Sequence, residues 1–396
     1  MHRRRGAPVL AAFVLAACAN PNVARLNDPQ ATARSVTAQE KEWIAEGDAF
    51  EKKLEEKNAF LVDAGAQAYL DAMTARLLEA AGASGAPLRV RVLRPSIFNV
   101  VVLANGMVGI DVLYFSLLED GAQLAAILGH EIEHHLDRHR LRSERERRNQ
   151  RTISFVAMVP LVALGLGEIG LQAADEMAAG MAGRYSREQE MDADRSGLRM
   201  ALAAGYDVRS APRIFENMMG LEEEGKKEKV EVRPADRTHP ETPERLALMR
   251  EAVAALQGEG ADFAATTADR SGFEMALAPF FLEDARSYLD RHWLGRAAAL
   301  VERYLAVRPL NAEGWFMKAE VARLSAAGES ARASGSAAAY RRATELDPKM
   351  AKAWRGLGLA LRDQGREADA HDPLRRYLAL DHDAVDRPIV EAWLVE

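Results

Sequence analysis

The sequence predicts an α+β domain with a small sheet, followed by a domain built only from helices. Helical hydrophobic spacing over residues 38–83 gives way to strand-like alternation over 88–112. Helical signals return at Asp120, and from about Ala278 the pattern is wholly helical and repeats. The 396 residues contain 48% apolar and 28% charged residues, which is ordinary globular usage. This composition excludes a disordered chain, a collagen and a multi-span membrane protein.

Residues 1–17 have the layout of a secretory signal peptide. Three consecutive arginines precede an apolar run that ends at Ala17 and is too short to span a bilayer. The run ends in Leu-Ala-Ala-Cys, which resembles the lipobox of bacterial lipoproteins. The resemblance implies cleavage before Cys18 and lipidation of this residue, the only cysteine of the chain. The alternative is a plain signal peptide; in either case residues 18–37 are expected to form a flexible tether.

Three strands are expected after the first helical stretch. Residues 88–93 alternate between apolar and mostly basic side chains. Two further strands are expected at Phe98–Leu103 and Met107–Val112, and the Asn-Gly pair at 105–106 between them is a strong hairpin signal. The sheet is therefore small and lies among helices.

The next helix carries the residues with the clearest chemistry. It is expected to open at Asp120, with Gln123 completing a capping box. Further along, His130 and His134 lie four residues apart and hence on one face, so that they can bind one metal ion with Glu131 beside them as general base. Apolar residues surround the motif, which predicts a buried helix whose histidines need a partner. One zinc ion per chain satisfies them; the alternative is two core histidines satisfied by other neighbours.

A zinc ion bound by two histidines needs a third protein ligand. The acidic cluster at 188–194 offers four carboxylates, and helical phase separates them into two faces. Glu188 and Asp192 fall on a solvated face, whereas Glu190 and Asp194 point inward, one turn apart. Glu190 is therefore predicted as the third ligand, and Asp194 as the acceptor that fixes the tautomer of a histidine ligand. The alternative is four surface carboxylates.

These motifs together resemble one enzyme family. His-Glu-Ile-Glu-His and the Glu-Met-Asp-Ala-Asp run at 190–194 are similar to the HExxH and ExxAD signatures of the HtpX and CAAX prenyl protease family of zinc metallopeptidases. Further similarities lie at 99–106, at His139 and in the Thr-His-Pro-Glu-Thr-Pro-Glu-Arg segment at 238–245. The resemblance covers about residues 38–255, and the helical tail is similar to that of the BepA-like periplasmic branch.

The resemblance implies an α+β zincin-type metalloprotease domain of the gluzincin kind over residues 38–257. It implies that zinc polarises the scissile carbonyl while Glu131 moves the proton of the attacking water. It also implies catalytic roles for His239 and Arg245 in stabilising the oxyanion, although His239 could instead cap the zinc in a latent state. The strand at Phe98–Leu103 is expected to bind an extended substrate by strand addition.

Residues 278–396 repeat at an interval of 39. Trp315 and Trp354 are 39 residues apart, and two prolines show the same spacing. The tetratricopeptide period is 34, and the small-residue stretch at 326–335 can hold the five extra residues. The pattern resembles about three tetratricopeptide repeats plus a capping helix, a solenoid with a concave surface for proteins. The alternative is an unrelated helical bundle.

Three other segments carry weaker expectations. Residues 154–170 are apolar and are expected to form a buried or lid-like helical pair beside the active site; the alternative is a membrane span, for which their length is borderline. The basic run at 138–151 suits a solvated helix or, alternatively, contact with anionic lipid headgroups. Residues 222–230 are expected to form a charged, exposed loop.

The sequence thus predicts a zinc metalloendopeptidase that degrades misfolded or stalled proteins of the bacterial cell envelope. The alternative function is a repeat-containing periplasmic assembly chaperone with a latent protease. Expected partners are protein and peptide substrates, envelope assembly proteins through the repeats, and the membrane through lipidated Cys18. A net charge of -7 argues against nucleic acid. The expected location is the periplasmic side of the envelope, anchored at the outer membrane or, alternatively, soluble in the periplasm.

Overall fold

The computed structural model describes residues 25–27, 37–94, 100–143, 185–228, 242–325 and 329–395. Within these ranges, no helix combines the length and the apolar composition that crossing a bilayer requires. The predictions for the signal peptide, Cys18, His239 and the apolar segment at 154–170 lie outside the described residues, as does most of the basic run.

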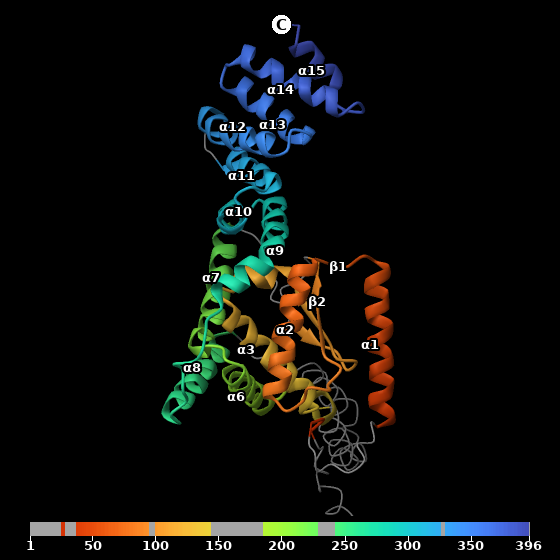
Figure 1. Cartoon of the computed structure of the whole chain (residues 1–396), viewed down its shortest axis with the longest axis vertical. Coiled ribbons are helices and arrows are strands. Elements are labelled where there is room, and N and C mark those ends of the chain that lie inside the picture. Colours follow the sequence, from red (N-terminus) through yellow and green to blue (C-terminus); the bar gives the residue numbers. More distant parts are fainter. Residues whose placement is uncertain are drawn as a thin grey trace, which may run out of the picture.

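One four-stranded sheet lies in the body of the molecule, in the order β1-β2-β4-β3 (Figure 1). The strands are β1 Phe60–Leu61, β2 Arg89–Leu93, β3 Val100–Val102 and β4 Met107–Asp111. β2 pairs in parallel with β4, whereas the β1–β2 and β3–β4 pairs are antiparallel. β3 therefore forms one edge of the described sheet.

The hairpin predicted at Asn105-Gly106 joins β3 to β4. The backbone of Leu103 donates to the carbonyl of Met107, and Gly106 has a φ of +84°. A Cβ at Gly106 would lie 2.2 Å from the carbonyl oxygen of Pro87. Both the positive φ and this close approach require glycine. Gly106 therefore allows the hairpin to pack against the segment that precedes β2.

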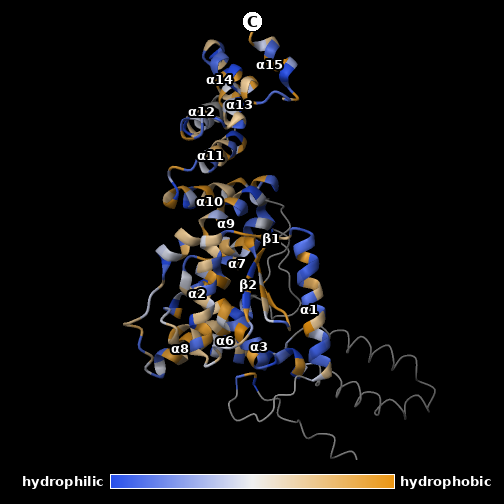
Figure 2. Cartoon of the chain, turned by 45° about the vertical axis from the view of Figure 1, so that its right-hand side comes forward, coloured by the Kyte–Doolittle hydropathy of each residue, from blue (hydrophilic) through white to orange (hydrophobic). Residues whose placement is uncertain are grey.

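The first helical stretch contains two helices with β1 between them. α1 spans Ala38–Glu56 and α2 spans Ala64–Ala80. Thr37 caps α1 in a capping box with Glu40, whereas Asp63 caps α2. α1 is mostly hydrophilic and stands beside the sheet (Figures 1 and 2). The two-residue β1 was not predicted, because its short apolar run fits the helical spacing around it.

The motif helix is α3, Gly121–Leu136, which follows the 3-10 segment η2, Val112–Leu117. Asp120 caps it as predicted, but Gln123 accepts a hydrogen bond from the backbone of Glu119 rather than closing a capping box on Asp120. Nearly every residue of α3 is buried, as the sequence predicted.

The helices α6 Arg187–Ala203, α7 Pro212–Glu228 and α8 Thr242–Gly258 complete the body, with η3 Val208–Ser210 between α6 and α7. The expectation of a charged loop at 222–230 is wrong for residues 222–228, which continue α7. Its last turns satisfy their backbone groups within the helix and expose their charges to solvent, so acidic and basic residues do not end it.

The flexible tether expected at 18–37 is docked where the structure describes it. The backbone of Leu26 donates to the carbonyl of Leu136, and Arg25 donates to both carboxylate oxygens of Glu133 at 2.5 and 2.8 Å. Glu133 is only 2% exposed. A buried carboxylate needs a cation, which explains why this part of the tether lies against α3.

The C-terminal helices form a column above the body (Figure 1). They are α9 Arg270–Asp290, α10 Leu294–Val307, α11 Ala312–Ser325, α12 Glu329–Leu346, α13 Ala351–Asp363, α14 Glu367–Leu380 and α15 Arg387–Trp393. The indole nitrogens of Trp315 and Trp354 donate to the carbonyls of Pro309 and Pro348, both at 2.8 Å. The interval of 39 in the sequence therefore corresponds to a repeated local structure.

The hydrophobic core does not end where the repeats were expected to begin. One continuous core runs from Ala66 to Val321, and a second from Ala319 to Val390. α9 packs on η2, where Phe280 stacks on Phe115 with ring centroids 5.5 Å apart. Ala278 lies fully buried inside α9. The first three helices of the column, α9 to α11, thus contribute to the core of the body.

This continuity predicts different outcomes for two truncations. A chain that ends at Ser325 keeps α9 to α11 on the body and should unfold cooperatively in thermal denaturation followed by circular dichroism. A chain that ends at Leu277 cuts α9 in its middle and exposes the surface that Phe281 and Tyr288 cover, so it should lose that transition or aggregate. Equal melting temperatures for both fragments would contradict the shared core.

Candidate metal centre

The centre forms where α3 crosses α6, at a contact between two glycines. A Cβ on Gly129 would lie 2.6 Å from the carbonyl oxygen of Gly197, and a Cβ on Gly197 would lie 2.6 Å from the backbone nitrogen of His130. Real Cβ atoms do not approach so closely, so the two backbones touch only because both residues are glycine. Glycine costs roughly 1 kcal/mol in a helix relative to alanine, and here the close approach offsets that cost.

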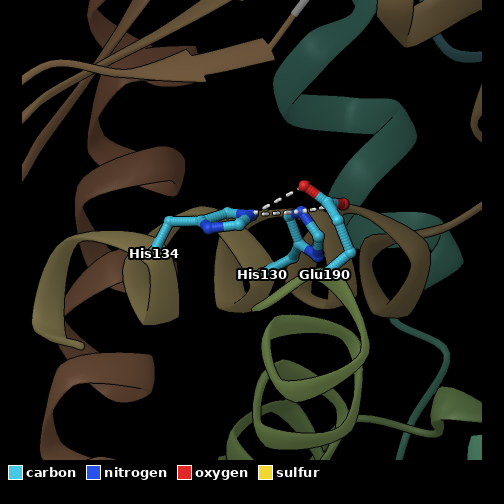
Figure 3. A group of neighbouring side chains, drawn as sticks. All are labelled: His130, His134 and Glu190. Carbon is cyan, nitrogen blue, oxygen red and sulfur yellow. Dashed lines mark hydrogen bonds and ion pairs between the residues drawn. The ribbon is translucent and has the colours of Figure 1, made fainter. Parts of the chain in front are cut away.

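This crossing brings the three predicted ligands together (Figure 3). The Nε2 atoms of His130 and His134 are 2.9 Å apart. The carboxylate of Glu190 lies 3.7 Å from the Nε2 of His130 and 3.6 Å from the Nε2 of His134. All three side chains are buried, and their ligand atoms lie within 4.8 Å of one another.

These spacings suit one small divalent cation. Two ligand atoms bound to zinc at about 2.0–2.1 Å in a tetrahedron lie roughly 3.3 Å apart. The shortest distances between the three side chains, 2.9, 3.6 and 3.7 Å, fall on either side of that value, with a different oxygen of Glu190 facing each histidine. Two imidazoles and one carboxylate are also a donor set that zinc accepts, with a fourth position left for water. The residues therefore fit the metal that the sequence predicts.

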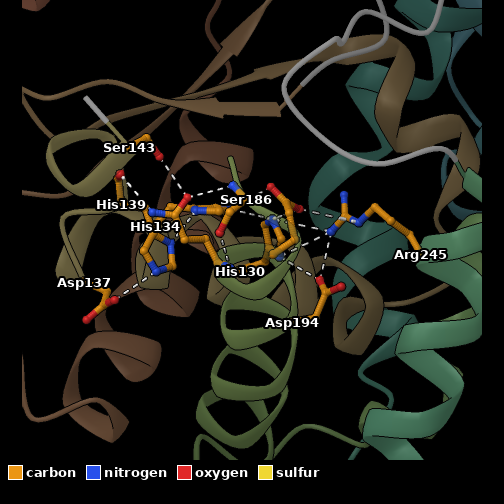
Figure 4. A network of polar contacts seen from close by, with 10 residues as sticks. His130, His134, Asp137, His139, Ser143, Ser186, Asp194 and Arg245 are labelled. Atoms are coloured by element: carbon orange, nitrogen blue, oxygen red, sulfur yellow. Dashed lines mark hydrogen bonds and ion pairs between the residues drawn. The ribbon is translucent and has the colours of Figure 1, made fainter. Parts of the chain in front are cut away.

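Asp194 lies directly behind the first histidine (Figure 4). Its Oδ1 is 2.7 Å from the Nδ1 of His130 and accepts a hydrogen bond from Nη2 of Arg245 at 2.9 Å. The guanidinium of Arg245 also lies 3.9 Å from Glu190 and rests over the ring of Phe215. Arg245 thus sits against the groups that support the ligands.

The electrostatics of this network hold Asp194 ionised. Burial alone would raise the pKa of Asp194, but Arg245 and His130 more than offset it and hold that pKa well below its usual range. An ionised carboxylate accepts the Nδ1 proton of His130 and leaves Nε2 to face the metal.

Glu131 is buried next to His130, at 4% exposure. Tyr114 of η2 lies in the same electrostatic environment and was not singled out from the sequence. Burial raises the pKa of Tyr114 to about 12. The charge of Glu131 also raises this pKa, whereas the charge of Arg245 lowers it. The phenol therefore keeps its proton at neutral pH. Tyr114 lies in an apolar run of the sequence, so nothing in the sequence indicated that it lies near the metal centre.

The helical phase assigned to α6 agrees with the exposure of its side chains. Glu190 and Asp194 are buried, and Glu188 and Asp192 are exposed. The arginines of this face pair with α8 and its end: Arg195 lies 3.5 Å from Glu251, and Arg199 lies 2.9 Å from Glu259, the residue after α8. The solvated face is thus salt-bridged to a neighbouring helix.

Comparison with known proteins identifies the family. Residues 64–253 match the model of Peptidase family M48. Residues 64–253 carry a domain of peptidase family M48. This confirms the family predicted from the paired motifs, a family of metallopeptidases.

Three relatives extend the match. The putative beta-barrel assembly-enhancing protease of Vibrio cholerae serotype O1 is 28% identical over 316 residues, which are 78% of this chain and 59% of that protein. The beta-barrel assembly-enhancing proteases of Escherichia coli K12 and Yersinia pestis are 23% identical over 178 residues and 22% identical over 187 residues. Each match covers 44% of this chain and 37% of the relative. The chain thus spans less than two thirds of the length of these relatives.

The geometry predicts which carboxylate matters for the metal. Glu190→Ala removes a buried oxygen ligand and should lower zinc affinity by more than the roughly 10–100-fold that loss of an outer partner costs. Glu188→Ala, two residues away on the exposed face, is the matched control and should bind zinc like the unmodified protein. Metal content after dialysis against a chelator measures both. Equal loss in the two variants would refute the assigned phase of α6.

Proposed function

We propose that the chain is a zinc-dependent metalloendopeptidase of the bacterial cell envelope that degrades misfolded or stalled envelope proteins. The observation that carries this proposal is the buried group of His130, His134 and Glu190, with Glu131 adjacent to it on α3. The match of residues 64–253 to peptidase family M48 supports the reaction class.

Each residue has a proposed task. A zinc ion held by the two histidines and Glu190 would supply Lewis acidity for the scissile carbonyl and acidify water. Glu131 would take the proton of the attacking water and return it to the leaving amine. Asp194 would orient His130.

The contacts of Arg245 favour a task that differs from the oxyanion role implied by family resemblance. Its Nη2 is engaged with Asp194 and lies 3.3 Å from the Nδ1 of His130. We therefore assign it to holding the carboxylates behind the ligands. The part proposed for His239, as transition-state partner or as cap on the zinc, rests on the resemblance alone.

The surroundings of the site support an extended, partly apolar substrate. β3 offers the backbone of an edge strand for strand addition. A cavity of about 820 Å³ lies between the β3–β4 hairpin, α1 and the end of α3. Apolar side chains in its wall include Trp43, Ile44, Leu103 and Leu136. Misfolded proteins expose the apolar segments that such a cavity accepts.

We propose that the helical column contains tetratricopeptide-type repeats that recruit clients. The two matching Trp–Pro contacts in α11 and α13 support repetition, and stacked helix pairs commonly bind proteins. The relatives are named for beta-barrel assembly, which supports envelope assembly proteins as partners. A repeat-based assembly chaperone with a latent protease is the second candidate, favoured by the same column.

The proposed location follows from the leader. A signal peptide ending before Cys18, followed by lipidation, would hold the protein on the periplasmic side of the envelope, at the outer membrane. Labelling with a radioactive fatty acid, with Cys18→Ala as control, tests the anchor directly.

A single substitution separates the protease from the chaperone. Glu131→Gln keeps all three ligands, so it should bind one zinc ion per chain yet lose roughly 10²–10⁴-fold in cleavage of an unfolded protein, because only proton transfer is lost. Glu188→Gln, exposed on α6, is the control and should cleave normally. Cleavage by Glu131→Gln at the rate of the control would rule out the proposed chemistry.

A further inference from the structure

The two histidine ligands are supported in different ways. The Nδ1 of His130 meets a carboxylate, that of Asp194, at 2.7 Å. The Nδ1 of His134 instead meets the Nδ1 of a third histidine, His139, also at 2.7 Å. His139 is 1% exposed and has no part in the proposed chemistry. Figure 4 shows the three rings and the carboxylates on both sides of them.

The proton positions follow from the ligand that faces the metal. If Nε2 of His134 binds a cation, its Nδ1 carries the proton and donates to the Nδ1 of His139. His139 must then carry its own proton on Nε2. That atom lies 2.9 Å from Oδ2 of Asp137, at ion-pair distance but without the angle of a hydrogen bond. A continuous path of polar contacts therefore leads from the ligand to a carboxylate.

Asp137 is itself held in place. Its Oδ2 lies 2.6 Å from Nη1 of Arg142, and its Oδ1 accepts a hydrogen bond from Nη2 of the same residue at 2.9 Å. The charge of the carboxylate is therefore paired at the end of the path.

We propose that His139 is a positioning residue for the metal centre, which links Asp137 to His134 and fixes the tautomer and ring orientation of that ligand. This inference rests on the proposed function, because it takes the metal to lie between His130, His134 and Glu190. His139 does not touch the substrate or the reacting atoms.

The local backbone aims His139 at the ligand. Arg138, two residues after the end of α3, has a φ of +56°, a conformation that few residues other than glycine adopt. Its guanidinium donates to Glu40 at 2.7 Å, which anchors the turn to α1. The chain thus reverses after α3 and returns the ring of His139 to within 4.9 Å of the ring of His134.

The same turn is joined to the helix that carries the third ligand. Gln189, next to Glu190, donates to the carbonyl of His139 at 3.4 Å and accepts from the hydroxyl of Ser143 at 2.8 Å. Tyr185, just before α6, stacks on the ring of His134 at 4.1 Å. His139 therefore sits where α3 and the start of α6 are tied together.

Loss of this contact has a specific consequence. Without His139, the Nδ1–H of His134 loses this hydrogen bond, which weakens the preference for the ring orientation and tautomer that present Nε2 to the metal. Outer partners of histidine ligands commonly account for 10–100-fold in metal affinity. A residue that only filled space would leave the affinity of the folded protein unchanged.

The test uses the full chain and three variants. His139→Leu removes the acceptor at similar volume. His139→Asn keeps an oxygen near the place of Nδ1 but cannot reach Asp137. His135→Leu changes the neighbouring histidine, which bonds to the backbone of Leu103, and is the matched control. Apo protein is titrated with Co²⁺ and Zn²⁺ against a chelator, with the Co²⁺ visible spectrum and urea unfolding of the apo form recorded.

We expect His139→Leu to bind both metals about 10–100-fold more weakly and to alter the Co²⁺ spectrum. His139→Asn should fall between it and the unmodified protein, and His135→Leu should match the unmodified protein. Unchanged affinity and spectrum in folded His139→Leu would overturn this inference and leave the proposed function intact. Should that variant fail to fold, unchanged affinity in both His139→Asn and Asp137→Asn would overturn it equally. An unmodified protein that binds neither metal would overturn both proposals.

Discussion

The centre depends on one steric constraint, the backbone contact between Gly129 in α3 and Gly197 in α6. The α3 helix can supply two histidines and a glutamate, but the third ligand must come from another helix. Only at this short separation does Glu190 reach the same point as the two Nε2 atoms. Burial also explains the charged contacts near the crossing, because a buried carboxylate needs a cationic or imidazole partner. Arg245 forms an ion pair with Asp194, and Arg25 forms one with Glu133.

Periodicity made much of the site predictable. The spacing of His130 and His134 placed both on one face of a buried helix, and a 100° step per residue turned Glu190 inward and Glu188 outward. Those predictions needed only the geometry of one helix at a time. The hairpin was predictable for the same kind of reason, since a positive φ at Gly106 is a local requirement.

Contacts between segments distant in the sequence were not predictable. Gly129 and Gly197 are ordinary residues until the helices cross, and nothing in an alternating pattern shows that β2 pairs in parallel with β4. The docking of Arg25 and the shared core beneath α9 arise from partners over 100 residues away. The link from His134 to His139 needed the turn at Arg138, whose φ no local rule fixes. The sequence therefore predicted the residues of the metal site better than it predicted how the helices and strands pack.

The most direct test of the glycine contact is the zinc content of Gly197→Ala. Alanine favours the helix by roughly 1 kcal/mol, so loss of metal could not come from a weaker α6. Gly220→Ala, in α7 with open space around it, is the matched control. The account predicts that Gly197→Ala stays helical by circular dichroism but retains less than about a tenth of the zinc of the control, in line with a displaced ligand. Full zinc occupancy in Gly197→Ala would contradict it.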